Sequence, residues 1–334
     1  MSNAAAEQQI SAPTLADVRA AAKLCDQVIT TPLLENPEVN DLLSGRLLIK
    51  AETAQRTGAF KFRGAYNRIR QMDEAQKKRG VIAYSSGNHA QAVALAAQIL
   101  GTSALIVMPD DAPLSKMART RELGGSIITY HRATEVREEV AERVQAEGNY
   151  VMVPPNEDRR VMAGAGTLAL ELMDQFGTAD SLDAVLVPCG GGGLTAATAI
   201  VLRELSPDTQ VYAVEPELFD DTRRSLAAGK RLSNPKGRQT ICDAIMTDTP
   251  GALTFPINQQ LLAGVLTVSD ADVRCAMAFA FEHYKIVVEP GAAVGLAAVL
   301  SQKIDISRRT IAVIVTGGNV DAADYCAALN AKAE

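Results

Sequence analysis

Short runs of β-branched residues alternate with longer segments of helical periodicity, and this alternation restricts the fold more than any other feature. The strand candidates are residues 47–50, 81–84, 104–108, 126–130, 184–188, 210–214 and 310–315. Most are separated by segments whose apolar residues recur at helical spacing, at residues 134–147, 161–176, 194–205, 270–284 and 292–302. Because parallel strands need long crossover connections, the pattern predicts an α/β fold with mostly parallel sheets.

The composition excludes several classes of partner. A chain of 334 residues, 47% hydrophobic, has room for two domains. Its net charge of −6, with 4% aromatic residues and no Trp, argues against nucleic-acid binding. The longest apolar stretch, residues 92–108, contains Gly101 and several polar residues, so we expect a helix followed by a strand rather than a membrane span.

Cysteine usage and the N-terminus indicate a cytoplasmic protein. The cysteines are odd in number, far apart and without a C-x-x-C pair, which predicts neither a disulfide framework nor a thiolate metal site: Cys25, Cys189, Cys242, Cys275 and Cys326. Residues 1–10 have no basic segment and no apolar run, so no signal peptide is expected.

Three loops that directly follow predicted strands are rich in glycine and small polar residues: residues 85–89, 189–194 and 316–319. In parallel sheets, ligands bind at these strand ends. Four consecutive glycines, Gly190 to Gly193, carry an entropic cost of about 0.5–1 kcal/mol each. Their N–H groups and the following helix N-terminus suit a phosphate, although a tightly packed turn is the alternative. No Lys-Ser or Lys-Thr follows, so a small phosphorylated cofactor is favoured over a nucleotide.

Lys61 stands between Phe60 and Phe62. If this apolar setting is buried, it lowers the pKa of the amine and makes it a nucleophile. Neutral lysines form Schiff bases with carbonyl compounds, including pyridoxal phosphate. A lysine on a surface helix is the alternative for Lys61 taken alone. Together with the glycine loop, the pair of features favours pyridoxal phosphate as the cofactor.

Six segments together carry a family resemblance: residues 57–65, 85–91, 190–193, 240–244, 288–292 and 316–319. In these residue types and in their order along the chain, they resemble the serine/threonine dehydratase group of pyridoxal-phosphate enzymes of fold type II, which includes threonine ammonia-lyase and serine racemase. The resemblance covers nearly the whole chain. It implies a tryptophan synthase β-like fold with two three-layer α/β domains: a large cofactor domain, residues 1–69 and 158–334, and a small inserted domain, residues 70–157. It also implies a homodimer and an amino acid as the small-molecule substrate.

The resemblance assigns roles around the cofactor. Lys61 would hold it covalently and take the Cα proton of the substrate, while Phe60 would pack beside its ring. Asn88 would hydrogen-bond the phenolic oxygen. The Thr316 hydroxyl would face the pyridine nitrogen, which a hydroxyl cannot keep protonated, so elimination is favoured over full carbanion storage. The phosphate would lie on Gly190, Gly191, Gly192, Gly193 and Leu194.

Further residues would contact the substrate. By the same resemblance, Ser86 would be the second catalytic residue, facing the Cα from the side opposite Lys61. Ser85 and His89, with neighbouring N–H groups, would hold the substrate carboxylate. Arg137 aligns with a position facing the substrate side chain and suits a second carboxylate. A pair between Arg137 and a glutamate of its own helix is the alternative.

The expected reaction is β-elimination from a β-hydroxy amino acid, giving a 2-oxo acid and ammonia. L-Threonine or L-serine is the default substrate, and Arg137 makes 3-hydroxyaspartate an alternative. Serine or aspartate racemisation and β-replacement are alternatives with the same cofactor, and a sensor without turnover is the non-enzyme alternative. Ala59 and Ala244 stand where the group commonly has Ser and Gly, which leaves the substrate open.

The resemblance also implies a divalent cation. In metal-dependent members a Glu, a main-chain carbonyl four residues on and an acidic residue six on bind the ion, and these positions match Glu215, Phe219 and Asp221. Oxygen ligands of this kind suit Mg²⁺ or Ca²⁺. Solvated carboxylates of a surface loop are the alternative. The chain ends soon after residue 319, so we expect no regulatory domain of the kind that mediates feedback in biosynthetic threonine deaminases.

Overall fold

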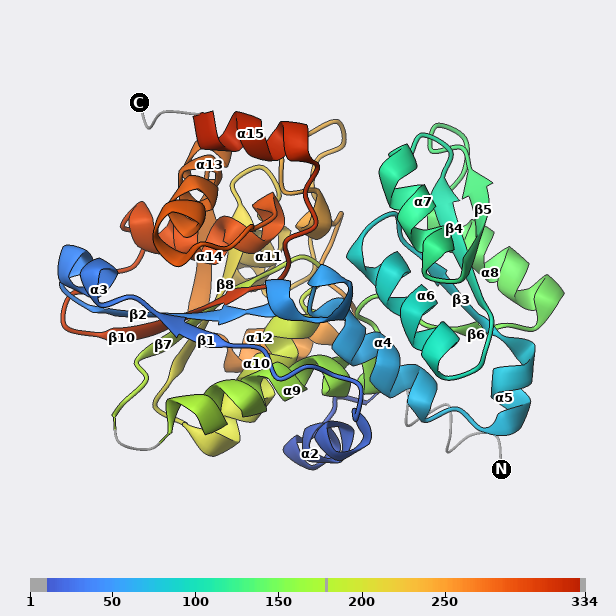
Figure 1. Cartoon of the computed structure of the whole chain (residues 1–334), viewed down its shortest axis with the longest axis horizontal. Helices are drawn as coiled ribbons and strands as arrows, with labels where there is room; N and C mark the ends of the chain where they lie inside the picture. Colours follow the sequence, from blue (N-terminus) through green and yellow to red (C-terminus); the bar gives the residue numbers. More distant parts are fainter. Residues whose placement is uncertain (1–10, 178–179, 331–334) are drawn as a thin grey trace.

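The computed structural model of the chain describes residues 11–177 and 180–330. The chain forms two α/β halves, each built on its own sheet (Figure 1). Residues 1–10, in which no signal peptide is expected, lie outside the described residues.

The larger half contains a six-stranded sheet in the order β1-β2-β10-β7-β8-β9. All neighbours pair in parallel except β1 and β2, which are antiparallel. The strands are β1 (Leu33–Glu35), β2 (Arg46–Ala51), β7 (Ala184–Pro188), β8 (Gln210–Pro216), β9 (Gly264–Val268) and β10 (Thr310–Val315).

The smaller half contains a four-stranded, wholly parallel sheet in the order β5-β4-β3-β6. Its strands are β3 (Val81–Tyr84), β4 (Ala104–Pro109), β5 (Gly125–Tyr130) and β6 (Val151–Met152). All four lie within the predicted insertion, residues 70–157, whose exact limits stay a prediction.

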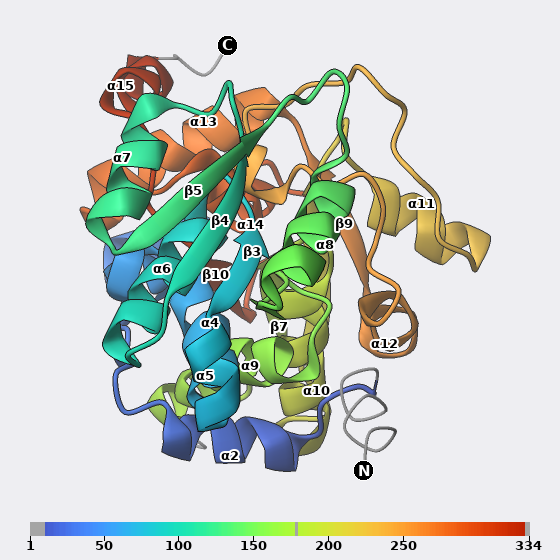
Figure 2. The ribbon, with the colours of Figure 1, turned by 90° about the vertical axis from the view of Figure 1, so that its right-hand side faces the viewer.

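Helices cover both faces of each sheet, as three-layer halves require (Figure 2). The larger half contains α2 (Leu15–Leu24), α3 (Pro37–Leu43), α9 (Arg159–Phe176), α10 (Gly193–Leu205), α11 (Asp221–Ala228), α12 (Thr254–Leu261), α13 (Asp270–Phe279), α14 (Pro290–Leu300) and α15 (Ala322–Asn330). The smaller half contains α5 (Glu74–Arg79), α6 (Asn88–Ile99), α7 (Leu114–Glu122) and α8 (Arg137–Gly148). Helix α4 (Lys61–Arg70) packs against α9 of one half and α6 of the other. The short helices are η1 (Glu52–Ala54), η2 (Arg56–Gly58), η3 (Asp243–Ile245) and the π-helical turn η4 (Ala280–Tyr284).

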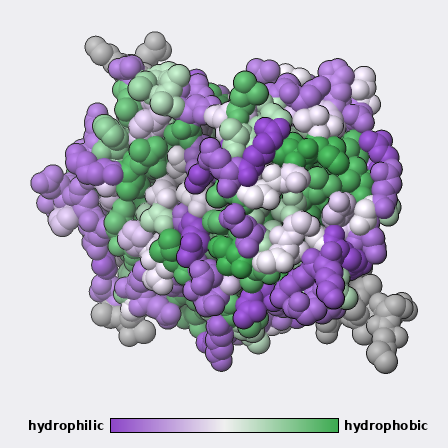
Figure 3. Space-filling model, turned by 45° about the vertical axis from the view of Figure 1, so that its right-hand side comes forward, coloured by the Kyte–Doolittle hydropathy of each residue, from purple (hydrophilic) through white to green (hydrophobic). Residues whose placement is uncertain are grey.

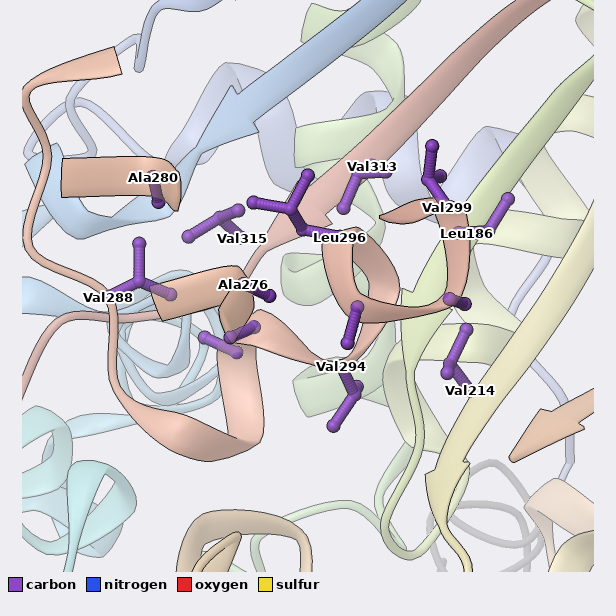
Figure 4. Close-up of a cluster of buried hydrophobic side chains, with 14 of the residues drawn as sticks. Leu186, Val214, Ala276, Ala280, Val288, Val294, Leu296, Val299, Val313 and Val315 are labelled. Carbon is purple, nitrogen blue, oxygen red and sulfur yellow. The ribbon is translucent and has the colours of Figure 1, made fainter. Parts of the chain in front are cut away.

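The core of the larger half follows from the two-residue period of its strands. In β10, Val313 and Val315 face α13 and α14, whereas Ile314 faces α2, α9 and α10. Helix α14 is buried from Gly291 to Val299, because it lies between the sheet and α13. Its side chains Val294 and Leu296 belong to the hydrophobic cluster that α13, α14 and the sheet enclose (Figure 4).

All seven predicted strands are confirmed, and the sequence pattern missed β1, β6 and β9. β1 and β6 have only three and two residues, too few to show a period. β9 directly follows the apolar residues Leu261 to Ala263, which hide its start. The predicted helix at residues 134–147 begins later, at Arg137, and the predicted helix at residues 270–284 ends in the π turn η4.

Other expectations from composition concern the cysteines, the long apolar stretch and membrane-spanning segments. The five cysteines are all free. Helix α6 and strand β4 account for the long apolar stretch at residues 92–108. Within residues 11–177 and 180–330, no helix combines the length and apolarity needed to cross a bilayer. Polar and apolar side chains are interspersed over the face drawn in Figure 3.

A buried charge cluster fixes α4 against the larger half. Both Arg63 and Glu52 have no exposed side-chain surface, and two nitrogens of the guanidinium donate to Glu52 at 2.7 and 2.8 Å. Arg63 also donates to both carboxylate oxygens of Glu171, at 2.7 and 2.8 Å, and Lys50 donates to Glu171 at 2.9 Å. The two cations and two carboxylates therefore neutralise each other inside the protein.

We predict that Arg63→Met lowers the free energy of unfolding by about 3–5 kcal/mol, because it leaves two carboxylates beside a single buried cation. Arg46→Met is the matched control: Arg46 also binds two carboxylates, those of Glu35 and Asp180, but its side chain is 35% exposed. Its loss is expected to change stability by less than about 1 kcal/mol. Urea unfolding followed by circular dichroism measures both values, and equal losses would contradict the prediction.

Candidate active site

A cleft of about 940 Å³ opens between the two halves. The carboxyl ends of β3, β7 and β10 meet there, so all three glycine-rich loops line it, together with the start of α4. The structure thus brings together the side chains that the sequence singled out for the cofactor and substrate, apart from the expected metal ligands, which lie outside the cleft wall.

Lys61 is the first residue of α4 and lines this cleft. Its Nζ donates to the carbonyl oxygen of Pro155 at 2.8 Å and lies 5.1 Å from the centre of the Phe60 ring. Burial lowers the pKa of Lys61 to about 8, because the charged amine loses its hydration inside the protein. Near neutral pH, a substantial fraction of the amine is therefore nucleophilic.

The tetraglycine loop presents its N–H groups rather than its carbonyls. The Gly191 carbonyl accepts from the Thr254 hydroxyl at 2.6 Å, and the Gly192 carbonyl accepts from the Thr195 hydroxyl at 2.8 Å. Within the described residues, the N–H groups of Gly190, Gly191 and Gly192 donate to no protein atom. Helix α10 begins at Gly193 and adds the positive end of its dipole, so the loop has the donors that an anion requires.

Close packing explains why glycine occupies these positions. Gly192 has a φ of +84°, and a Cβ there would lie 2.5 Å from Nδ2 of Asn258. A Cβ at Gly191 would overlap the side-chain amide of Asn156. The alternative interpretation, a tightly packed turn, therefore holds together with the anion-binding one.

Asn88 begins α6 at the edge of the cleft. Its Nδ2 donates to Oε1 of Glu289 at 2.6 Å, and its Oδ1 accepts from Nδ2 of Asn319 at 2.7 Å. Glu289 and Asn319 lie in segments that carry the family resemblance, but sequence reasoning assigned neither of them a role. The only feature of the sequence that could have pointed to these two residues is their place in residues 288–292 and 316–319.

Ser85, Ser86 and His89 all line the cleft. The Ser85 hydroxyl accepts from the N–H of Gly87 at 3.2 Å. Nε2 of His89 lies 2.8 Å from the Val153 carbonyl and therefore carries the proton, while Nδ1 is buried without a partner in the described residues. Burial, together with the charge of Lys61, lowers the pKa of His89 to about 3, so the imidazole is neutral. The donors that this loop could offer to an anion are consequently hydroxyl and main-chain N–H groups rather than a cationic histidine.

Thr316 directly follows β10 and is 5% exposed. Its carbonyl accepts from the N–H of Phe60 at 2.9 Å, which ties the end of β10 to the residue before Lys61. Phe60, Leu194 and Thr316 all line the cleft, as expected of residues beside a cofactor ring and phosphate.

Arg137 lines the cleft and also pairs within its own helix. Its Nε donates to Oε1 of Glu138 at 2.6 Å, and its guanidinium lies 5.7 Å from the centre of the Tyr84 ring. Its Nη groups make no hydrogen bond with the described residues. Both interpretations of the sequence therefore describe the same side chain.

Glu215 and Asp221 lie at the end of β8 and the start of α11. The Glu215 carboxylate accepts the N–H groups of Thr222 and Arg223, each at 3.0 Å, and Oδ2 of Asp221 is buried without a partner in the described residues. Burial and mutual repulsion raise the pKa of Glu215 to about 8, and burial raises that of Asp221 to about 7. The alternative interpretation, solvated carboxylates of a surface loop, is wrong, because both residues are buried.

Sites with three or more protein carboxylates, imidazoles or thiolates do not occur among the described residues. The expected set of two carboxylates and the carbonyl of Phe219 falls below that number. Two buried acids and an orphaned oxygen nevertheless fit a hard cation whose remaining ligands are carbonyls or water.

Comparison with known proteins identifies the relatives of this chain. The family model described as pyridoxal-phosphate dependent enzyme matches residues 24–317. L-threo-3-hydroxyaspartate ammonia-lyase of Saccharomyces cerevisiae is 41% identical over 323 residues, which cover 96% of this chain and 97% of that protein. Serine racemase of Schizosaccharomyces pombe is 40% identical over 316 residues, covering 94% of this chain and 96% of that protein.

Solved structures agree with the sequence comparison. The crystal structure of a T.th. threonine deaminase matches with a TM-score of 0.88 and 42% identity, covering 92% of this chain and 99% of that one. Maize serine racemase matches with a TM-score of 0.89 and 37% identity, covering 95% of this chain and 97% of that one. The predicted fold class is confirmed.

We predict that Gly192→Ala weakens binding of pyridoxal phosphate at least about tenfold, because its Cβ meets Asn258 and disturbs the anion-binding loop. Gly237→Ala is the matched control, since Gly237 has a φ of +82° and no atom within 4 Å of the added Cβ. Absorbance titration of the cofactor-free proteins measures the dissociation constants. Phosphate-free pyridoxal is expected to show a much smaller difference, and an equal loss for both ligands would contradict the prediction.

Proposed function

The chain belongs to the pyridoxal-phosphate-dependent enzymes of fold type II, the family of threonine ammonia-lyase and serine racemase, and on this premise we propose that it is an ammonia-lyase acting on a β-hydroxy amino acid. The observation that carries the proposal is the position of Lys61. Its amine, with a lowered pKa, lies in the cleft between an anion-binding loop and a second loop of hydroxyl and amide groups.

The residues of the cleft fit the cofactor. Gly190 to Gly193 and the N-terminus of α10 would hold its phosphate, Lys61 would hold it covalently, and Asn88 and Thr316 would contact the polar atoms of its ring. When bound, pyridoxal phosphate supplies an electron sink that lowers the barrier to losing the Cα proton of an amino acid.

The side chains of this chain supply the proton transfers. Lys61 Nζ, neutral at and above a pH of about 8, accepts the Cα proton. The Ser86 side chain lines the same cleft, and its hydroxyl would serve as the second acid–base group. Main-chain N–H groups at the start of α6 and the Ser85 hydroxyl bind the substrate carboxylate, since neutral His89 contributes no charge. The overall reaction gives a 2-oxo acid and one ammonia, because the water lost in elimination is taken up again on hydrolysis.

Within this class we propose 3-hydroxyaspartate as the preferred substrate over L-serine and L-threonine. Arg137 supports this choice, because it lines the cleft, and its Nη groups, which make no hydrogen bond with the described residues, suit a second carboxylate. The 41% identity with the yeast 3-hydroxyaspartate enzyme supports it independently. Racemisation is the second candidate, favoured by the 40% identity with a serine racemase and by the presence of both Ser86 and Lys61 in the cleft wall. Chirality of recovered substrate, measured beside 2-oxo acid release, separates the two activities.

We also propose a Mg²⁺ or Ca²⁺ ion at Glu215, Asp221 and the Phe219 carbonyl, in a cytoplasmic homodimer. The buried acids, with pKa values raised to about 8 and about 7, support the ion, because a divalent cation would compensate their repulsion. Family resemblance alone supports the dimer and the compartment.

We predict that Lys61→Ala abolishes 2-oxo acid release, a loss of at least about a thousandfold, because the variant has no amine to bind the cofactor or accept the proton. Borohydride reduction followed by mass spectrometry detects cofactor fixed to the chain. Lys116→Ala is the matched control, since Lys116 lines the same cleft but pairs with Asp243 at 2.7 Å. Cofactor fixed to Lys61→Ala would contradict the proposal.

The same lysine sets a pH dependence. The cofactor-free protein is expected to capture pyridoxal phosphate about tenfold faster at pH 9 than at pH 7 and to level off above, because the neutral fraction of an amine with a pKa of about 8 saturates there. Stopped-flow absorbance measures the rate. A rate that keeps rising beyond pH 10 would indicate an ordinary, exposed lysine.

We predict that Arg137→Leu raises the KM for 3-hydroxyaspartate by roughly 10- to 100-fold and changes that for L-serine little, because a charge-assisted hydrogen bond to the second carboxylate is lost. Arg119→Leu is the matched control, since Arg119 also lines the cleft and pairs with a glutamate of its own helix, Glu122. Steady-state kinetics on both substrates provide the test. An equal loss on both would show that Arg137 does not select the substrate.

A further inference from the structure

The amide of Asn88 is held from both ends by residues to which sequence reasoning assigned no role. Glu289 accepts from its nitrogen at 2.6 Å, and Asn319 donates to its oxygen at 2.7 Å. The three residues lie in three separate segments, at the start of α6, directly before α14 and after β10. Their contact is therefore a product of the tertiary fold rather than of a local motif.

Two glycines leave the space that this arrangement needs. A Cβ at Gly317 would lie 2.5 Å from Oε1 of Glu289, and a Cβ at Gly58 would lie 2.8 Å from Oδ1 of Asn319. Asn319 is held in turn by a second hydrogen bond, from Nδ2 to the Thr57 carbonyl at 2.7 Å. The backbone around Asn88 is thus shaped to admit both of its partners.

The Glu289 carboxylate has no structural duty in its own helix. Glu289 is the N-cap residue of α14, yet its side chain makes no capping hydrogen bond, and its backbone carbonyl alone accepts from Ala292 and Ala293. The side chain points to Asn88 instead and is 3% exposed as a residue. A carboxylate buried at this cost and directed at one amide indicates a specific function.

Burial has the largest influence on the ionisation of Glu289. Burial and the more distant charge of Asp243 raise its pKa to about 8, whereas the hydrogen bond from Asn88 and the charge of Lys116 favour the ionised form. The amide of Asn88 is thus the nearest group that stabilises the carboxylate, and the two side chains hold each other in place.

We propose that Glu289, assisted by Asn319, is a positioning residue that fixes the Asn88 amide so that its second Nδ2 hydrogen faces the cleft as a donor. An amide nitrogen carries two hydrogens, of which Glu289 takes one. The hydrogen bond from Asn319 to the Asn88 oxygen also prevents the amide from flipping, so the oxygen does not take the place of the nitrogen toward the cleft. The inference rests on the proposed function for the group that receives the donor: the phenolic oxygen of pyridoxal phosphate.

A fixed donor at that position has an electronic consequence. It stabilises the anionic phenolic oxygen over the protonated one, and these two forms of the bound cofactor absorb at different wavelengths. An Asn88 amide free to rotate would present its oxygen part of the time, which favours the protonated form. Glu289, which also lines the cleft, would therefore act on the cofactor through its hydrogen bond to Asn88.

The test is a double-mutant cycle on the holoenzyme with Glu289→Met, Glu289→Gln and Asn88→Ala. We expect Glu289→Met to weaken cofactor retention about tenfold and to shift absorbance toward the protonated form, whereas Glu289→Gln keeps an acceptor oxygen and stays near the wild type. In the Asn88→Ala background, Glu289→Met is expected to have no further effect on either readout. Asn319→Ala, which leaves Glu289 in place, is expected to cause the same absorbance shift.

Two results would overturn the inference. An undiminished effect of Glu289→Met in the Asn88→Ala background would place Glu289 in the packing of α14 instead. An unchanged cofactor spectrum in both Glu289→Met and Asn319→Ala would show that Asn88 needs no positioning. Wild-type protein that fixes no cofactor at Lys61 would instead refute the proposed function, so the two failures are distinguishable.

Discussion

The double pairing of Arg63 with Glu52 and Glu171 is the interaction on which the active site depends. Buried charges tolerate little displacement, because each lost hydrogen bond leaves a charge without compensation. Arg63 therefore fixes the start of α4 against the larger half, two residues after Lys61. Since α4 also packs on α6, the smaller half is positioned by the same helix. Because Lys61 lies in the same first turn of α4 as Arg63, the anchoring of Arg63 also fixes the position of the Lys61 amine beside the Pro155 carbonyl.

The sequence predicted those parts of the fold and site that are encoded locally. Seven strands, the glycine loop and Lys61 each have a signature within a few neighbouring residues. The contacts of Asn88 have none, because its partners stand 201 and 231 residues away along the chain. Only the order of strands in the sheets brings these loops together. Short elements such as β6 were missed for a different reason: a strand of two residues has no period to detect.

For other residues the sequence predicts a place near the substrate but not the protonation state or the hydrogen bonds. The sequence placed His89 near the substrate, yet only the structure shows that the Val153 carbonyl holds its proton on Nε2 and that burial keeps it neutral. For Arg137 the sequence offered a choice between a cleft role and a helical pair. The structure shows the helical pair and places Arg137 in the cleft wall. A guanidinium has five N–H donors and Glu138 engages only Nε, so the pair is compatible with the proposed contact to a substrate carboxylate. The protonation state and the hydrogen-bond partners of a side chain depend on its three-dimensional surroundings, which a sequence motif does not describe.

Among the buried acidic residues of the larger half, Glu289 differs from the pair of Glu215 and Asp221 in how its charge is met. The two sites are therefore linked to the cleft in different ways. Glu289 has an amide partner, because it accepts a hydrogen bond from Asn88, which lines the cleft. Glu215 and Asp221 repel each other, and Oδ2 of Asp221 lacks any partner among the described residues. Their connection to the cleft passes through Thr222, whose N–H donates to Glu215 and whose hydroxyl lies 3.5 Å from Cys189 Sγ. Cys189 directly precedes the tetraglycine loop, and its thiol contacts the Gly190 carbonyl at 3.4 Å. These contacts join the acid pair to the base of the loop whose N–H groups are proposed to hold the cofactor phosphate.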